Sequence, residues 1–270
     1  MEFGGGTGEL AARLGAFLGG PREPVVVDAS AGLRARQGAL GVRAVASARE
    51  LDPAPTFAFG NEVLDALPVH RVVGDGAGGV LEVWVDLNRR GELVDRVREA
   101  STPALAARLA REGVSLARGQ VAEVCLALDA FVADAARLVS KGYLVSVDYG
   151  DDAKALYADT RLNGTLACYR GQRPAYDVFD HVGEQDVTAH VDFTAVDAAA
   201  RAAGLEDAGR ARQGPWLASL GLARYVEEAE DPRAAAAEVA RLTDAAALGS
   251  AFDVLAFKTR GLPDAPGFVA

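Results

Sequence analysis

The first half of the chain alternates short apolar runs with stretches in which apolar residues recur every three or four positions. Leu10, Leu14 and Leu18, for example, fall on one stripe of a helix. Alternation of this kind is typical of βαβ units, and it predicts an α/β fold with a parallel sheet. The predicted helices cover residues 7–18 and 31–40, and the predicted strands cover residues 25–28, 42–46 and 56–60, the last after a Pro53-Ala54-Pro55 breaker.

The alternation is interrupted after residue 68. Two β-rich runs, at residues 70–73 and 80–85, flank the glycine-rich residues 74–79, a pattern that predicts a β-hairpin. We therefore expect a hairpin-containing insertion over residues 69–118, within a single domain that covers residues 1–270.

The second half resumes with a long amphipathic helix, followed by a polar segment. Residues 151–192 are rich in turn-forming side chains, so we expect an irregular lid or substrate insertion there. The remaining predictions are a helix over 121–139 ended by Lys141-Gly142, a buried strand over 143–147, helices over 193–203, 215–228 and 232–247, and a closing strand over 251–258.

Charge and composition exclude several classes of protein. The 270 residues carry a net charge of −10, which argues against nucleic acid as a partner. No apolar run approaches the roughly 20 residues that span a bilayer, so we expect no membrane association. Two cysteines cannot build a disulfide framework or a cysteine-rich zinc site, so we expect a reducing, cytoplasmic compartment. The three histidines lack metal-ligand spacing, so we expect no metal site.

A glycine-rich turn near the start carries the sharpest local signal. Gly6, Gly8 and Ala11 satisfy the G-x-G-x-x-A pattern of a dinucleotide fold, whereas Glu2 followed by Gly4, Gly6 and Gly8 satisfies the pattern of an S-adenosylmethionine site. A carboxylate at the mouth of the first strand repels a pyrophosphate and suits an ammonium group. The charge of Glu2 therefore favours S-adenosylmethionine.

An acidic residue follows the next predicted strand. Asp28 lies 20 residues after Gly8, and a carboxylate at this place can accept hydrogen bonds from both hydroxyls of a ribose. The alternative is that Asp28 caps the helix that follows it. We expect Asp28 and the adjoining Ala29 to contact the cofactor.

Three polar residues follow the strand predicted at residues 56–60. Asn61 and Glu62 fall at its carboxyl end, where open α/β sheets place their sites, and Asp65 lies one helical turn further on. We expect the three side chains to converge. The alternative is that Asn61 caps a short helix on which the two carboxylates are solvated.

Six motifs occur in the order found in one known family. Through them the chain resembles, over nearly its whole length, the MidA-like family of class I S-adenosylmethionine-dependent methyltransferases. The Asn61–Pro68 stretch, similar to the family's N-E-x-x-D-A-L-P, is the most specific of these motifs. The six lie at residues 2–10, 28–37, 61–68, 147–150, 186–193 and 213–221.

The resemblance implies a fold and a cofactor. The fold is a Rossmann-like class I methyltransferase sheet with helices on both faces, and the cofactor is S-adenosylmethionine. Mitochondrial members of the family are protein arginine methyltransferases that help to assemble respiratory complex I, so the implied acceptor is an arginine-containing protein. The expected cofactor contacts come from Glu2, Gly4, Gly6, Gly8, Asp28, Ala29 and Asn61.

An arginine acceptor needs carboxylates near it, because the pKa of a guanidinium is about 12.5–13.8. Glu62 and Asp65 are the candidates for this catalytic role, with Asn61 as a group that orients them. Asp148 and His190 are expected to line the acceptor pocket.

The chain departs from the family pattern in two ways. Gly5 replaces a proline and Asp28 replaces a glutamate, which should preserve ribose binding. Family members also carry a longer segment ahead of the glycine turn, so we expect the first strand to be largely missing here. The isoleucine-free, arginine-rich composition is typical of GC-rich bacterial genomes, in which an internal valine codon is readily taken for a start, and Met1 is expected to be such a start.

Two other classes of function stay open at this stage. A dinucleotide-dependent oxidoreductase would share the glycine turn and Asp28, but it does not explain Asn61–Pro68. A non-catalytic assembly factor would keep the methyltransferase fold without turnover. A homodimer is compatible with the sequence.

Overall fold

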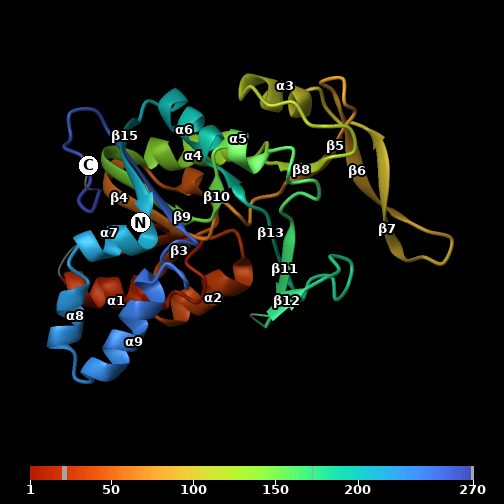
Figure 1. The fold of residues 1–270 in the computed structure, drawn as a ribbon. Helices are drawn as coiled ribbons and strands as arrows, with labels where there is room; N and C mark the ends of the chain where they lie inside the picture. Colours follow the sequence, from red (N-terminus) through yellow and green to blue (C-terminus); the bar gives the residue numbers. More distant parts are fainter. Residues whose placement is uncertain (20–22, 172, 269–270) are drawn as a thin grey trace. The chain divides into compact units, whose positions relative to one another are not determined.

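The computed structural model describes residues 1–19, 23–171 and 173–268, which form two compact units (Figure 1). Among these residues, no helix combines the length and apolar character that a bilayer crossing requires. Unit 1 comprises Met1–Val63, Phe131–Tyr149 and Ala199–Ala270, and unit 2 comprises Leu64–Ala130 and Gly150–Ala198.

Unit 1 is built on a seven-stranded sheet with the order β15-β16-β9-β4-β1-β2-β3. The strands from β9 to β3 are parallel, whereas β16 and β15 are antiparallel to their neighbours. The predicted α/β fold is therefore confirmed. The strands are β1 (Glu2–Phe3), β2 (Val25–Val27), β3 (Arg43–Val45), β4 (Ala54–Asn61), β9 (Val139–Asp148), β15 (Glu206–Arg212) and β16 (Asp253–Lys258).

The central strand β1 is short but is paired on both sides. Glu2 lies opposite Val26 of β2 and Phe59 of β4, and Phe3 lies opposite Val27 and Gly60. The chain that leaves β1 therefore emerges at the carboxyl edge of the parallel strands, beside the end of β4.

Helices cover the sheet of unit 1 on both faces, with α1 and α2 on one side and α4 on the other (Figure 1). Ala11 of α1 is buried against Val26 and Val42, and the ring of Phe131 in α4 packs edge-on against Phe3 at 5.4 Å. The helices that lie in unit 1 or end there are α1 (Glu9–Leu18), α2 (Ala31–Ala39), α4 (Leu128–Leu138), α6 (Phe193–Ala202), α7 (Gln213–Ser219), α8 (Ala223–Glu228) and α9 (Pro232–Thr243), with a 3-10 turn at Ala48–Glu50.

The apolar stripe of α1 lies on its exposed side. Leu10, Leu14 and Leu18 are 44%, 39% and 49% exposed, whereas Ala11 is 1% exposed. The helix approaches strands β2 and β3 through the small Ala11 side chain. The apolar stripe in the sequence thus correctly predicts that a helix forms here, but it does not predict which face of the helix is buried.

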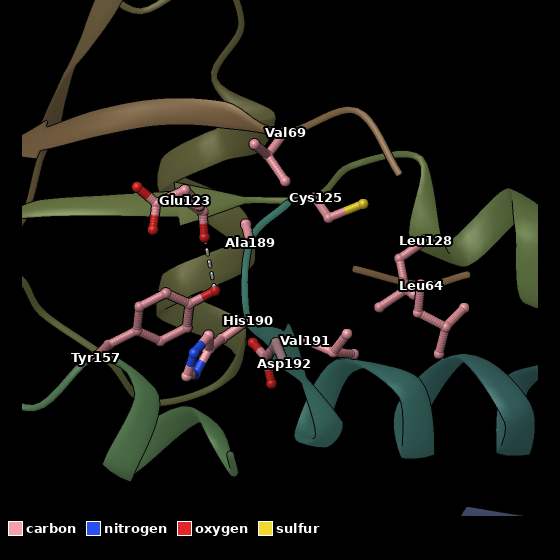
Figure 2. Close-up of a pocket in the computed structure, with 10 residues that line it drawn as sticks. All are labelled: Leu64, Val69, Glu123, Cys125, Leu128, Tyr157, Ala189, His190, Val191 and Asp192. Carbon is pink, nitrogen blue, oxygen red and sulfur yellow. Dashed lines mark hydrogen bonds between the residues drawn. The ribbon is translucent and has the colours of Figure 1, made fainter. Parts of the chain in front are cut away.

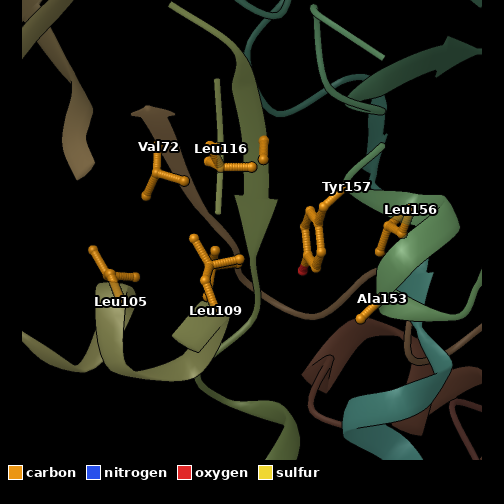
Figure 3. Close-up of a cluster of buried hydrophobic side chains, with 9 residues drawn as sticks. Val72, Leu105, Leu109, Leu116, Ala153, Leu156 and Tyr157 are labelled. Carbon is orange, nitrogen blue, oxygen red and sulfur yellow. The ribbon is translucent and has the colours of Figure 1, made fainter. Parts of the chain in front are cut away.

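Unit 2 contains a four-stranded antiparallel sheet with the order β7-β6-β5-β8. The predicted hairpin is confirmed as β5 and β6, and β7 extends it. A buried apolar cluster covers this sheet, with contributions from α3 and α5 (Figure 3). The elements are β5 (His70–Gly74), β6 (Val80–Leu87), β7 (Leu93–Glu99), α3 (Ala104–Arg111), β8 (Val121–Val124) and α5 (Ala153–Leu156).

The segment predicted to be irregular, residues 151–192, contains regular structure. Its strands form a three-stranded antiparallel sheet and a parallel two-stranded pair. They are short and polar, so they lack the apolar alternation that would have marked them in the sequence. They are β10 (Gly150–Asp151), β11 (Ala167–Arg170), β12 (Arg173–Ala175), β13 (Asp186–Thr188) and β14 (Val191–Asp192).

The helix predicted over residues 121–139 is wrong in its first part. Residues Val121–Val124 form β8, which pairs antiparallel with β5, and α4 starts only at Leu128. An apolar run of this length fits both the period of a helix and the period of a strand, and pairing with β5 favours the strand.

Two smaller expectations about strands are also wrong, and one strand was missed. Lys141-Gly142 does not separate a helix from a strand but lies inside β9, opposite Pro55 and Thr56 of β4. β4 itself starts at Ala54, so Pro55 is inside the strand rather than ahead of it. The edge strand β15 was not predicted, because its sequence is polar and its register shifts between Asp207 and Gly209.

Candidate functional site

The glycine turn joins β1 to α1 at the carboxyl edge of the sheet. The amide of Gly4 donates to the carbonyl of Val27 at 2.9 Å, and Gly4, Gly6 and Gly8 all have positive φ. A side chain at Gly4 would meet Val63 at 2.7 Å, whereas a side chain at Gly6 would point into open space. The turn therefore packs against the segment that follows β4 and leaves the backbone of Gly6 accessible to a ligand.

Asp28 directly follows β2, beside this turn, and is 7% exposed. Its Oδ1 accepts the amide of Ser30 at 2.9 Å, and its Oδ2 accepts Nε2 of Gln37 at 3.1 Å. The N-cap of α2 is Ser30, whose Oγ accepts the amide of Leu33, so the capping alternative for Asp28 is wrong. Ala29 is exposed, and its carbonyl accepts a hydrogen bond from Arg34.

Gln37 is a site residue to which sequence reasoning assigned no role. Its side chain is fully buried, and Nε2 donates both to Asp28 and to the carbonyl of Gly6 at 2.9 Å. The amide thereby ties the glycine turn to the acid at the end of β2. The available signal was a polar residue on the buried face of the helix that follows Asp28.

Glu2 is buried at the mouth of β1, with 8% exposure. Its Oε2 has no hydrogen-bond donor among the described residues. Burial raises the pKa of the Glu2 carboxyl; the charge of the N-terminal ammonium opposes this effect, and the charge of nearby Asp28 adds to it. A buried carboxylate oxygen without a donor suits the cationic group of a ligand.

Asn61 and Glu62 lie together at the end of β4, and both are exposed. Nδ2 of Asn61 donates to Oε1 of Glu62 at 3.0 Å, and Glu62 has the unusual φ of +51°. Left-handed backbone at a residue other than glycine is costly and recurs at functional sites.

Asp148 supports this turn from the end of β9. It is 0% exposed, its Oδ2 accepts the amide of Val63 at 3.2 Å, and its Oδ1 accepts the amide of Tyr149 at 3.0 Å. Its carboxylate thus holds backbone groups next to Glu62, which makes it a positioning residue of the site.

The expected helical turn between Glu62 and Asp65 is wrong, because the residues after β4 form bends and turns. Asp65 belongs to unit 2, where it is 4% exposed and its carbonyl accepts the amide of Ala189 at 3.1 Å. Of the three residues expected to converge, the structure brings Asn61 and Glu62 together. Asp65 is a buried residue of the other unit.

His190 lies in unit 2 on a small cavity of about 20 Å³ (Figure 2). Burial lowers the pKa of the His190 imidazole, and the charge of Arg161 adds to this effect while Asp151 opposes it. Tyr157 lines the same cavity, and its hydroxyl donates to the carbonyl of Glu123 at 3.1 Å. The cavity is lined by Leu64, Val69, Glu123, Cys125, Leu128, Tyr157, Ala189, His190, Val191 and Asp192.

Comparison with known proteins identifies the family. Residues 1–210 match the model of a family described as "putative S-adenosyl-L-methionine-dependent methyltransferase". The chain therefore belongs to this family. No curated protein matches the chain.

Two solved structures from Burkholderia thailandensis are similar over almost all of the chain. An uncharacterized protein is 34% identical with a TM-score of 0.88, and the match covers 100% of this chain and 76% of that one. A second protein, described as a likely methyl transferase and bound to S-adenosyl-homocysteine, is 35% identical with a TM-score of 0.84. That match covers 99% of this chain and 72% of the other. The fold is thus the Rossmann-like class I fold.

The cofactor is S-adenosylmethionine, and the residues of unit 1 fit it. The cofactor carries an ammonium group, a ribose diol and a sulfonium. The donor-free Oε2 of Glu2 matches the ammonium, the carboxylate of Asp28 matches the diol, and the open backbone at Gly6 allows close approach. Among the described residues, no cluster of three or more histidine, cysteine or acidic side chains is arranged to hold a metal ion.

Proposed function

We propose that this methyltransferase acts on a protein, at a side-chain nitrogen of arginine. The observation that carries the proposal is the exposed pair formed by Asn61 and Glu62 at the end of β4, the strand next to β1. Asp148 holds the backbone beside this pair, because it accepts the amide of Val63. Val63, which follows the pair, packs against Gly4 of the cofactor turn. The resemblance to the MidA-like family, which includes protein arginine methyltransferases, supports the same acceptor.

The chemistry asked of the chain is modest. The bound cofactor supplies a methyl group on a sulfonium, a good leaving group, so the protein mainly aligns the acceptor nitrogen with it. Such alignment is worth roughly 7–11 kcal/mol. In this proposal the carboxylate of Glu62 accepts a hydrogen bond from the guanidinium, orients its nitrogen and takes the proton released by methylation. Asn61 fixes the Glu62 carboxylate through the hydrogen bond between their side chains.

The left-handed backbone of Glu62 contributes to this role. The φ of +51° costs of order 1–3 kcal/mol, and the hydrogen bonds of its amide to Val147 and of the Val63 amide to Asp148 maintain it. A turn held in this way keeps the Glu62 side chain at the exposed strand end. It is therefore preorganised before the acceptor binds.

The test is transfer of labelled methyl groups to proteins of a lysate, with Glu62→Gln compared with the wild type. We expect the variant to bind S-adenosylhomocysteine with unchanged affinity by calorimetry and to lose at least about 100-fold in turnover, the usual size of a general-base contribution. Glu9→Gln, which changes an exposed carboxylate in the first turn of α1, is the control. Turnover in Glu62→Gln at the wild-type rate would contradict the role of Glu62.

The same assay separates the alternatives. A non-catalytic assembly factor would bind S-adenosylhomocysteine and label nothing. Mass spectrometry of a labelled acceptor identifies the methylated residue, and modification at a residue other than arginine would overturn the proposed acceptor.

A further inference from the structure

Two buried acids of unit 2 lie against each other without hydrogen-bond donors. The Glu112 side chain, just after α3, is 3% exposed, and neither of its carboxylate oxygens has a donor among the described residues. Asp192, the last residue of β14, is 9% exposed. Its Oδ1 accepts the amide of Ala195 at 3.0 Å, whereas its Oδ2 has no donor.

Two adjacent buried carboxylates cannot both stay ionised without a large cost, because each loses hydration and repels the other. Burial raises the pKa of Glu112 to about 8, with further contributions from a hydrogen bond to Asp192 and from its charge. At neutral pH Glu112 is therefore protonated and can donate to Asp192.

The groups around the pair do not neutralise Asp192 by themselves. Arg108 of α3, 5% exposed, donates to Asp129 at 2.7 Å, and its Nε lies 3.7 Å from Glu112. Arg111 is half exposed and reaches Glu112 only at 3.9 Å. From the other elements, the buried carboxylate of Glu123, the hydroxyl of Tyr157 and the thiol of Cys125 line the same cavity as Asp192. Burial raises the pKa of Tyr157 and of Cys125.

Asp192 also lines the small cavity of unit 2, so one member of the acid pair borders this space (Figure 2). The rings of Tyr157 and His190 and the side chains of Leu64 and Cys125 line the same cavity. Burial and Arg161 favour the neutral form of His190, so its ring does not compete as a cation. The cavity therefore offers Oδ2 of Asp192 and Oε1 of Glu123, neither with a donor among the described residues outside the acid pair, together with an aromatic ring and apolar walls.

We propose that Asp192 is the anionic anchor of a pocket for the charged N–H end of a cationic side chain, and that Glu112 releases its proton to solvent when the cation enters. The incoming N–H group takes the place of the Glu112 proton as the donor to Asp192. The two ionised carboxylates then face one or more new donors instead of each other.

The size of the cavity limits the class of ligand. About 20 Å³ admits a group of the size of a water molecule or slightly larger. An ammonium, or one amino end of a guanidinium, meets this limit, and the planar remainder of an arginine would stay at the mouth. Leu64, which lines the cavity, follows Glu62 by two residues in the chain. The inference rests on the proposed protein acceptor, because it assigns this pocket to a cationic side chain of that acceptor.

The experiment is calorimetric titration of the full chain with N-acetyl-arginine amide and, separately, N-acetyl-lysine amide from pH 6.5 to 9. We expect the affinity of the preferred probe to rise up to about tenfold per pH unit below about pH 8 and to level off above it. Near pH 7, titrations in buffers of different ionisation enthalpy should report release of about one proton. The comparison of the two probes shows which side chain the pocket prefers.

Two variants separate the roles of the acids. Asp192→Asn keeps an oxygen that can cap α6 and should lose at least tenfold in affinity. Glu112→Gln has no proton to release, so its binding should no longer depend on pH in this range. Glu99→Gln, an exposed change on β7 of the same unit, is the control, and circular dichroism confirms that each variant is folded.

Unchanged binding in Asp192→Asn, or pH-independent binding with no proton release in the wild type, would overturn the inference. Absence of binding by both probes would overturn it as well. The outcome of this experiment does not depend on turnover. A chain that binds the probes but methylates no protein would contradict only the proposed function. An active chain in which Asp192→Asn leaves probe binding unchanged would contradict only this pocket.

Discussion

The side-chain amide of Gln37 lies 3.1 Å from Oδ2 of Asp28 and donates to it from a fully buried position. The same nitrogen donates to the carbonyl of Gly6 at 2.9 Å. One side chain of α2 thus joins two parts of the cofactor site that leave neighbouring strands. Asp28 is expected to bind the ribose, and the glycine turn is expected to bind the rest of the cofactor. Because Gln37 bridges them, their relative positions are fixed.

Replacing Gln37 by leucine should weaken cofactor binding. The change removes two hydrogen bonds to buried acceptors, each worth about 0.5–1.5 kcal/mol or more where the partner is charged. We expect the affinity for S-adenosylhomocysteine, measured by calorimetry, to fall about tenfold or more. Arg36→Leu, an exposed change on the same helix, should leave it unaltered. Equal affinities in Gln37→Leu and the wild type would show that the bridge does not organise the site.

Glu2→Gln should have opposite effects on stability and on cofactor binding. Because the pKa of Glu2 is raised in the folded chain, its contribution to stability is present at low pH and is lost as pH rises through that pKa. At neutral pH the neutral amide should therefore raise the free energy of unfolding of the free protein. The same change removes the negative charge that faces the ammonium, so S-adenosylmethionine should bind more weakly.

Urea denaturation at pH 5 and pH 8 measures the first effect of Glu2→Gln, and calorimetry measures the second. The stability difference between variant and wild type should grow with pH. Glu9→Gln, which alters an exposed carboxylate in the first turn of α1, should show neither effect. Cofactor binding that is as tight in Glu2→Gln as in the wild type would remove Glu2 from the site.

Gly6→Ala and Gly41→Ala form a matched pair. Both glycines have positive φ, at 52° and 75°, and an added Cβ meets nothing within 4 Å at either position. The backbone cost should be similar, about 1–2 kcal/mol, and should appear as similar losses in the free energy of unfolding. Only Gly6→Ala should also weaken cofactor binding, because only Gly6 lies in the cofactor turn. Equal binding by the two variants would place the cofactor elsewhere.

Local signals in the sequence were enough to predict a cofactor site. Gly4, Gly6 and Gly8 mark a turn that needs positive φ, Asp28 directly follows the apolar strand β2, and Asn61 is the last residue of β4. In a parallel sheet the carboxyl ends of such strands meet at one edge, so their order along the chain already predicts their proximity. The α/β fold followed from the same alternation, and the cofactor from the acid and glycine pattern.

Contacts between distant segments decided the rest. Val121–Val124 became a strand because β5 pairs with it, and Lys141-Gly142 stayed inside β9 because β4 supplies its partners. The bridge from Gln37 to Gly6 and the pairing of Glu112 with Asp192 join residues far apart in the chain. No local period or motif encodes such contacts, since burial and partner choice are fixed only when the elements pack. The sequence by itself determined where the glycine turn and the acids at the strand ends lie, and the tertiary structure decided which side chains support them and which buried acids come to lie together.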